Sequence, residues 1–164
     1  MKTTAVAPIG SAAWASAFLT AFVEAGYTHA RPAILQPAEP FLDLSGEGIR
    51  RSLYLTSDPG NEELCLRPDL TIPVARDYLA SPRSGQPAAF CYLGPVFRYR
   101  GGKPSEFLQA GVESFGRPDR AAADAEMLAL GLEATAAFGV TDVEIRTGDV
   151  ALFIALIDAL KLYP

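Results

Sequence analysis

Residues 90–116 read FCYLGPVFRYRGGKPSEFLQAGVESFG, which is the pattern of two strands joined by a tight basic turn. Polar side chains stand an even number of positions apart, as Arg98 and Arg100 before the turn and as Gln109 and Glu113, with Gly111 midway, after it. Because successive side chains of a strand point to opposite faces, residues two apart in sequence share a face. The stretch therefore predicts an antiparallel hairpin with one polar face.

The polar face of this predicted hairpin has the composition of a small-ligand pocket. If Arg100 pairs near Ser105, then Arg98, Gln109 and Glu113 share a face, and Gly111 leaves open space between the last two. A cation, an amide and a carboxylate around a gap offer donors and acceptors to a small ligand. The alternative is an ordinary solvent-facing sheet surface, and the pattern alone leaves both interpretations open.

A second polar group lies upstream, in the stretch LCLRPDLTIPVAR at residues 64–76. Thr71 is predicted to cap a helix that runs to about Ala80, with Pro73 in its first turn. Asp69 precedes this helix start, where a carboxylate can accept hydrogen bonds from free backbone N–H groups. Taken from the residues alone, this pair is interpreted as helix capping.

The rest of the chain predicts an α+β fold in a single domain spanning residues 1–164. Because parallel βαβ alternation is absent, the pattern favours an antiparallel sheet with helices on one side over a Rossmann fold. Helices are predicted at 11–25, ended by Gly26, at 119–138, capped by Asp119 and ended by Gly139, and from Asp149 to about Leu160. Strands are predicted at 32–37, at 52–56 and 63–66 around the turn 58–61, and at 141–147, with loops at 41–51 and 81–87.

Composition disfavours several classes of protein. The chain has 164 residues, 49% of them hydrophobic, and a net charge of −5, which argues against a surface that coats nucleic acid. No apolar run approaches the roughly 20 residues that a membrane-spanning helix needs. The N-terminus lacks the apolar core of a signal peptide, so a cytoplasmic protein is expected.

The sequence contains few residues that could bind a metal or cofactor or carry out redox chemistry. Cys65 and Cys91 stand alone in apolar, strand-like contexts, which is typical of buried thiols in a reducing compartment. His29 is the only histidine, which disfavours a zinc site and leaves the serines without a base partner. The turn Gly101–Lys103 lacks the spacing of a phosphate-binding P-loop. No cofactor, metal or catalytic residue is therefore predicted.

Two of these stretches resemble a known family. FRYR, the turn and FLQAGVESFG are similar to motif 2 of the class II aminoacyl-tRNA synthetases in its histidyl form, and LCLRPDLTIPVAR is similar to that family's histidine-side segment. The similarity runs from about Ser11 to the C-terminus and is greatest to the histidyl-synthetase-like regulatory subunits of ATP phosphoribosyltransferase. It implies a class II synthetase-like catalytic-type domain. Since the family continues well beyond Pro164, the chain is expected to be a truncated, N-terminal part of that domain.

The resemblance also implies a role for the polar groups of both stretches. In the family, the residues that match Asp69 and Thr71 bind the α-amino group of histidine, and the synthetases carry Glu where this chain has Asp69. Together with Gln109 and Glu113, these residues would form a histidine site, kept either as a relic or as a sensor.

An anion site beside the turn is implied as well. In the synthetases the arginine that matches Arg98 holds the ATP α-phosphate, and Arg100 stands where they have a glutamate. Two neighbouring cations repel each other unless an anion or a carboxylate lies between them. Arg98, Arg100 and Lys103 are therefore candidate phosphate-binding residues. The Arg100 departure and the short turn count against adenylate formation.

The function that the resemblance implies is regulatory. The chain would belong to a non-catalytic subunit that activates the short catalytic subunit of ATP phosphoribosyltransferase, at the first step of histidine biosynthesis, and helps to mediate histidine feedback. Expected partners are that catalytic subunit, a second copy of the chain through the motif 1 region at residues 32–37, and histidine; no nucleic acid or membrane is expected. The alternatives are an active histidyl-tRNA synthetase, which makes histidyl adenylate, and an inert dimerisation fragment.

Overall fold

The computed structural model describes residues 12–44, 47–137, 139–140 and 142–161. The chain divides into two compact units, one up to Met127 and one from Leu128 onward, each with its own internal contacts. The prediction of a single domain over residues 1–164 stays a prediction. Along the described residues, no helix combines the length and the apolar composition that crossing a bilayer requires.

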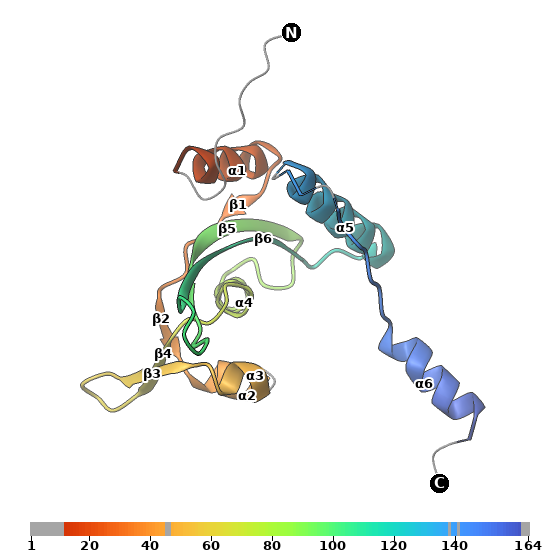
Figure 1. The fold of residues 1–164 in the computed structure, drawn as a ribbon. Helices are drawn as coiled ribbons and strands as arrows, with labels where there is room; N and C mark the ends of the chain where they lie inside the picture. Colours follow the sequence, from red (N-terminus) through yellow and green to blue (C-terminus); the bar gives the residue numbers. More distant parts are fainter. Residues whose placement is uncertain (1–11, 45–46, 138, 141, 162–164) are drawn as a thin grey trace. The chain divides into compact units, whose positions relative to one another are not determined.

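Helices and strands follow one another along the chain as drawn in Figure 1. The helices are α1 (Ala12–Glu24), α2 (Glu39–Leu44), α3 (Glu47–Arg50), α4 (Thr71–Ala80), α5 (Arg120–Ala137) and α6 (Val150–Ala159). The strands are β1 (Thr28–His29), β2 (Leu35–Pro37), β3 (Tyr54–Ser57), β4 (Glu63–Leu66), β5 (Ala88–Phe97) and β6 (Glu106–Phe115). Ser11, the first residue of the helix predicted at 11–25, and Phe138, the last residue of the helix predicted at 119–138, lie outside the described residues.

The strands of the first unit form two three-stranded sheets. One has the order β1-β5-β6, with β1 parallel to β5 and β5 antiparallel to β6. The other has the order β2-β4-β3 and is antiparallel. The α+β class and the two antiparallel hairpins are confirmed. The parallel pair β1–β5 departs from the predicted antiparallel sheet, and the long connection between these strands is what permits it.

Helix α4 packs against one face of the β5–β6 hairpin, as Figure 1 shows. Leu70 and Val74, at the start of α4, form a buried cluster with Tyr92 and Val96 of β5. Burying an apolar side chain of this size contributes roughly 1.5–3 kcal/mol. The cluster therefore holds the segment that precedes α4 against the hairpin.

Two of the predicted chain reversals have the expected hydrogen bonds. Gly26 ends α1 with a φ of 94°, and the N–H of Tyr27 donates to the carbonyl of Phe22 at 2.9 Å. This is the arrangement that favours glycine after a helix. In the β3–β4 turn, the Asp58 carboxylate accepts from the N–H of Gly60 at 2.8 Å. Both predictions are confirmed.

The predicted loop at 41–51 is wrong, because α2 and α3 occupy much of it. Phe41 is fully buried in α2 and packs with Ala38 and Cys65. Pro40 stands in the first turn of α2, where its missing N–H costs no hydrogen bond. The glycines and charges of the segment favoured a loop prediction, but tertiary packing stabilises α2 despite this local preference.

The predicted strand at 141–147 is also wrong. Among the described residues 142–149, none is in a strand, and Val143 and Ile145 are exposed. A strand needs a neighbouring ladder, and alternation of apolar residues does not supply one. The last helix was predicted correctly, since the Asp149 carboxylate caps α6 by accepting from the N–H of Ala151 at 2.8 Å.

Cys65 makes the stability of the fold sensitive to alkaline pH. Burial, reinforced by the carboxylates of Asp69 and Glu63, raises the pKa of its thiol from 9.0 to about 11. Because the folded state holds this proton more tightly than the unfolded chain does, the stabilisation is complete below about pH 9 and is lost as the pH rises to about 11. We expect the stability difference between the wild type and Cys65→Ala to shrink across this interval in urea unfolding. A constant difference would contradict the assignment.

Candidate functional site

Asp69 and Thr71 lie at the junction between β4 and α4. Asp69 has only 8% of its surface exposed, and its Oδ1 accepts from the N–H of Ile72 at 3.0 Å. The carboxylate of Asp69 therefore caps the helix. The prediction that Thr71 is the cap is wrong, because Thr71 is the first residue of α4 and its hydroxyl lies 3.2 Å from the hydroxyl of Tyr92.

The hairpin brings its predicted polar residues to the same place. The register of β5 and β6 puts Gln109 and Glu113 on one face, and a backbone hydrogen bond of 2.8 Å from Arg98 to Ser105 extends that register to Arg98. Their shared face is confirmed, although Arg98 lies opposite Ser105 where Arg100 was expected. The N–H of Leu70 donates to Gln109 Oε1 at 3.0 Å, which joins β6 to the start of α4.

The open space expected over Gly111 is filled by Tyr92. The two residues are opposite each other in the register, and a Cβ added at Gly111 would lie 2.5 Å from the Tyr92 hydroxyl oxygen. That hydroxyl donates to Glu113 Oε1 at 2.9 Å. Burial raises the pKa of Tyr92, an accepted hydrogen bond from Thr71 partly opposes this, and the Glu113 carboxylate adds to it. Gly111 therefore makes room for a side chain of the protein.

The basic residues near the turn are arranged around an aromatic ring. The guanidinium carbon of Arg100 lies 3.6 Å from the ring centroid of Phe107, and that of Arg98 lies 5.7 Å from it. The negative face of a ring attracts such cations, so the two arginines do not need a carboxylate between them. Arg98 Nε also donates to the carbonyl of Pro68 at 2.7 Å. Lys103 is exposed on the turn.

The resulting group of side chains offers mainly hydrogen-bond acceptors. Asp69, Thr71, Gln109 and Glu113 are brought together, and most of their free atoms are hydrogen-bond acceptors. Acceptors of this kind suit an ammonium group. Within the described part of the chain, no group of three or more His, Cys, Asp or Glu residues is placed to hold a metal ion.

A model of a known family covers nearly all of the sequence. The family is described as histidyl-tRNA synthetase, and its model matches residues 11–164. The chain belongs to the histidyl-tRNA synthetase family. Relatives named ATP phosphoribosyltransferase regulatory subunit, from Brucella ovis and Brucella abortus, are 44% identical over 130 residues, which are 79% of this chain. The chain spans about a third of the length of these curated relatives, at 34%.

Solved structures of the family show the same fold. The crystal structure of an ATP phosphoribosyltransferase regulatory subunit/histidyl-tRNA synthetase from Bacillus halodurans has a TM-score of 0.67 and 28% identity, over 84% of this chain and 38% of its own. The apo histidyl-tRNA synthetase of S. aureus has a TM-score of 0.56 and 30% identity, over 76% of this chain and 33% of its own. The predicted class II aminoacyl-tRNA synthetase fold is confirmed.

Sequence reasoning missed two buried residues near the candidate site, Tyr92 and Arg67. Tyr92 stands directly across the hairpin from a strand glycine, and that pairing was the available signal. Arg67 has only 5% of its surface exposed and donates from Nε to the carbonyl of Pro95 at 2.9 Å, and from a terminal nitrogen to the carbonyl of Pro32. Its signal was an arginine within an apolar run.

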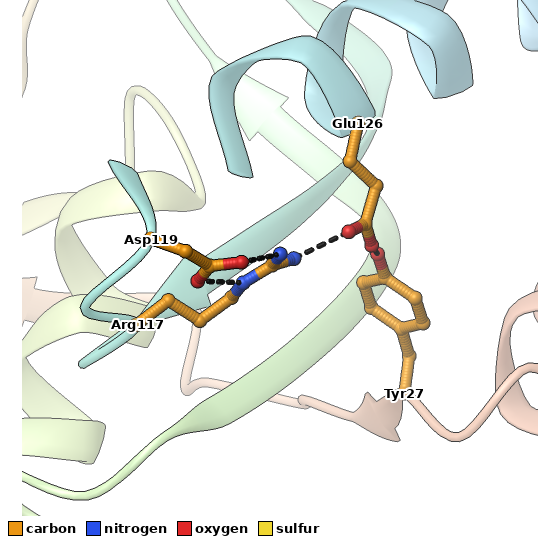
Figure 2. A network of polar contacts seen from close by, with 4 residues as sticks. All are labelled: Tyr27, Arg117, Asp119 and Glu126. Carbon is orange, nitrogen blue, oxygen red and sulfur yellow. Dashed lines mark hydrogen bonds and ion pairs between the residues drawn. The ribbon is translucent and has the colours of Figure 1, made fainter. Parts of the chain in front are cut away.

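A second polar cluster lies apart from the site and serves a structural role. Figure 2 shows the Arg117 guanidinium between the carboxylates of Asp119, at 2.7 Å, and Glu126, which also accepts from the Tyr27 hydroxyl at 3.2 Å. These bonds raise the pKa of Arg117 and lower the pKa of both carboxyl groups. The cluster lines a cleft of about 330 Å³. The cluster joins Tyr27, the residue before β1, to Glu126 of α5. Because two carboxylates already balance the cation, it leaves little attraction for an anion.

Proposed function

We propose that this chain is part of a non-catalytic regulatory subunit of ATP phosphoribosyltransferase. The observation that carries the proposal is the 44% identity over 130 residues to Brucella proteins of that name. Such a subunit would act in the cytoplasm, as a homodimer within a larger assembly. It would activate a short catalytic subunit that joins ATP to phosphoribosyl diphosphate and releases diphosphate, the first step of histidine biosynthesis.

The geometry supports a binding role at Asp69, Thr71, Gln109 and Glu113. We infer that these residues form a histidine sensor, because their acceptors suit an ammonium group and a second N–H group of the ligand. Feedback through this site requires that histidine bind the inhibited assembly more tightly than the active one. Arg98 and Arg100 would interact with a phosphate-bearing ligand or with the catalytic subunit, and Lys103 would add positive charge at the turn.

A histidyl-tRNA synthetase is the second candidate, because the matching family model carries that description. Arg100, which lies over the ring of Phe107, argues against synthetase activity. A cation here replaces the glutamate that the resembled synthetases use beside ATP. Histidine-dependent exchange of diphosphate into ATP would identify a synthetase directly.

The deciding experiment is to mix the intact protein with the short catalytic subunit and to measure phosphoribosyl transfer to ATP. A large rise in rate over the catalytic subunit alone is expected for a regulatory subunit. No rise would overturn the proposal, and the diphosphate exchange assay would then distinguish a synthetase from a protein without either activity.

Replacing Arg98 with Ala is expected to weaken activation without unfolding the protein. The change removes a charge and the bond to the Pro68 carbonyl, which is worth about 1.5–3 kcal/mol as a charged hydrogen bond. We expect the concentration of subunit needed for half-maximal activation to rise about tenfold. Arg120→Ala, at an exposed position, is the matched control. An unchanged activation constant in a variant that is still folded at the assay temperature would remove Arg98 from the site.

A further inference from the structure

The hydroxyl of Tyr92 stands between the two ends of the proposed histidine site. Its oxygen lies 2.9 Å from Glu113 Oε1, on β6, and 3.2 Å from Thr71 Oγ1, on α4. The ring has only 4% of its surface exposed and packs in the cluster that includes Leu70. Tyr92 thus links two residues that come from different elements.

The donors in this chain of hydrogen bonds can be assigned, because each hydroxyl has one proton. An ionised carboxylate only accepts, so Tyr92 donates its proton to Glu113. The oxygen of Tyr92 still has free lone pairs, so Thr71 donates to it. Burial raises the pKa of Tyr92, which keeps the proton on its oxygen. The order of donation is therefore Thr71 to Tyr92 to Glu113.

This order decides what the site offers to a ligand. Thr71 uses its proton inside the protein and presents only lone pairs, as does the second oxygen of Glu113. Asp69 also presents one free oxygen, because a backbone N–H holds the other. Gln109 is the exception, since its oxygen accepts from Leu70 and its amide N–H groups remain as donors. The site thus favours a ligand that carries N–H donors for Asp69 and Glu113 and an acceptor, such as a carboxylate, for Gln109.

We propose that Tyr92 is the positioning residue through which this site selects an amino acid that carries a ring N–H at the Glu113 end. The inference rests on the proposed function, because it concerns the same histidine site. Tyr92 holds Glu113 Oε1 and so leaves Oε2 to accept from the ring of the ligand. Gly111 provides the space that this arrangement requires. Without the hydroxyl, Glu113 loses its anchor, whereas the acceptors at the Asp69 end keep their places.

Binding of two ligands to the intact protein, measured by calorimetry, tests the proposal. L-Histidine carries a ring N–H, and β-(2-thienyl)-L-alanine has a ring of similar size without one. The wild type should prefer histidine by about 10- to 100-fold, because the analogue leaves the partly buried Glu113 oxygen without a donor. In Tyr92→Phe, which keeps the ring, histidine affinity should fall about tenfold and thienylalanine affinity should stay within about twofold.

Two control variants separate positioning from loss of structure. Tyr78→Phe removes the hydroxyl of another buried tyrosine, which donates to the carbonyl of Gln86 at 3.0 Å, and should leave both affinities unchanged. Thr71→Val should weaken both ligands alike, because both carry the α-ammonium group.

The possible outcomes identify which proposal is wrong. If the wild type selects histidine and Tyr92→Phe keeps the same ratio of affinities, the role of Tyr92 is overturned and the histidine site stands. If the wild type binds neither ligand, both the sensor and the role of Tyr92 are overturned. The activation assay with the catalytic subunit then judges the regulatory function separately.

Discussion

Replacing Arg67 with Met is expected to lower the free energy of unfolding by about 2–4 kcal/mol. Met retains much of the volume but leaves two carbonyl oxygens, those of Pro32 and Pro95, without their donor in a buried place. A buried polar group that loses its partner costs about 1–3 kcal/mol. Urea unfolding followed by circular dichroism measures the change.

The position of Arg67 explains why this effect should be large. Its side chain connects the end of β4 to β5, and its own carbonyl accepts from the N–H of Phe97 at 3.0 Å. The two sheets of the first unit therefore meet at this residue. Arg146→Met is the matched control, because Arg146 is 82% exposed and pairs with Glu144 on the surface. Equal stability of the two variants would refute a structural role for Arg67.

Replacing Gly111 with Ala is expected to destabilise the protein by about 1–3 kcal/mol, the usual cost of overpacking a filled interior. The new Cβ would lie 2.5 Å from the Tyr92 hydroxyl oxygen and 2.6 Å from the ring carbon that carries it. The ring is buried by Leu70 and Val74, so it has little room to move. The midpoint of urea unfolding reports the loss.

The control for this substitution is a glycine in open surroundings. Gly131 lies inside α5, and a Cβ added there would meet no atom within 4 Å. Because glycine is a poor helix former, Gly131→Ala should raise stability by about 0.5–1 kcal/mol. The two Gly-to-Ala changes should therefore have opposite signs. A harmless Gly111→Ala would mean that Tyr92 does not occupy the space above this glycine.

The parts of the fold that were predictable are those that local sequence decides. The hairpin of 90–116 follows from its alternation and its turn, and α4 follows from Pro73 and the residues before it. Helix α2 was missed because burial of Phe41 against Cys65 stabilises it, and no local pattern reports that contact. The strand expected at 141–147 failed because it depends on a partner strand.

The candidate site was predictable in its members and only partly in its geometry. Period-2 alternation alone puts Gln109 and Glu113 on one face. The role of Tyr92 depends on a cross-strand pairing with Gly111, which requires the register in residue detail. The arginines near the turn were expected to require an anion, and the contribution of Phe107 arises from the opposite strand.

The parallel pairing of β1 with β5 has a consequence for the order of folding. His29 pairs with Cys91, about sixty residues further along the chain, whereas β5 and β6 are joined by a short turn. Closing a long loop costs more entropy than closing a short one, so contacts between distant residues form later. We therefore expect the β5–β6 hairpin to form first during synthesis or refolding, and β1 to be added to an edge that already exists. The hairpin that carries Gln109 and Glu113 of the candidate site would then form before β1 pairs with β5.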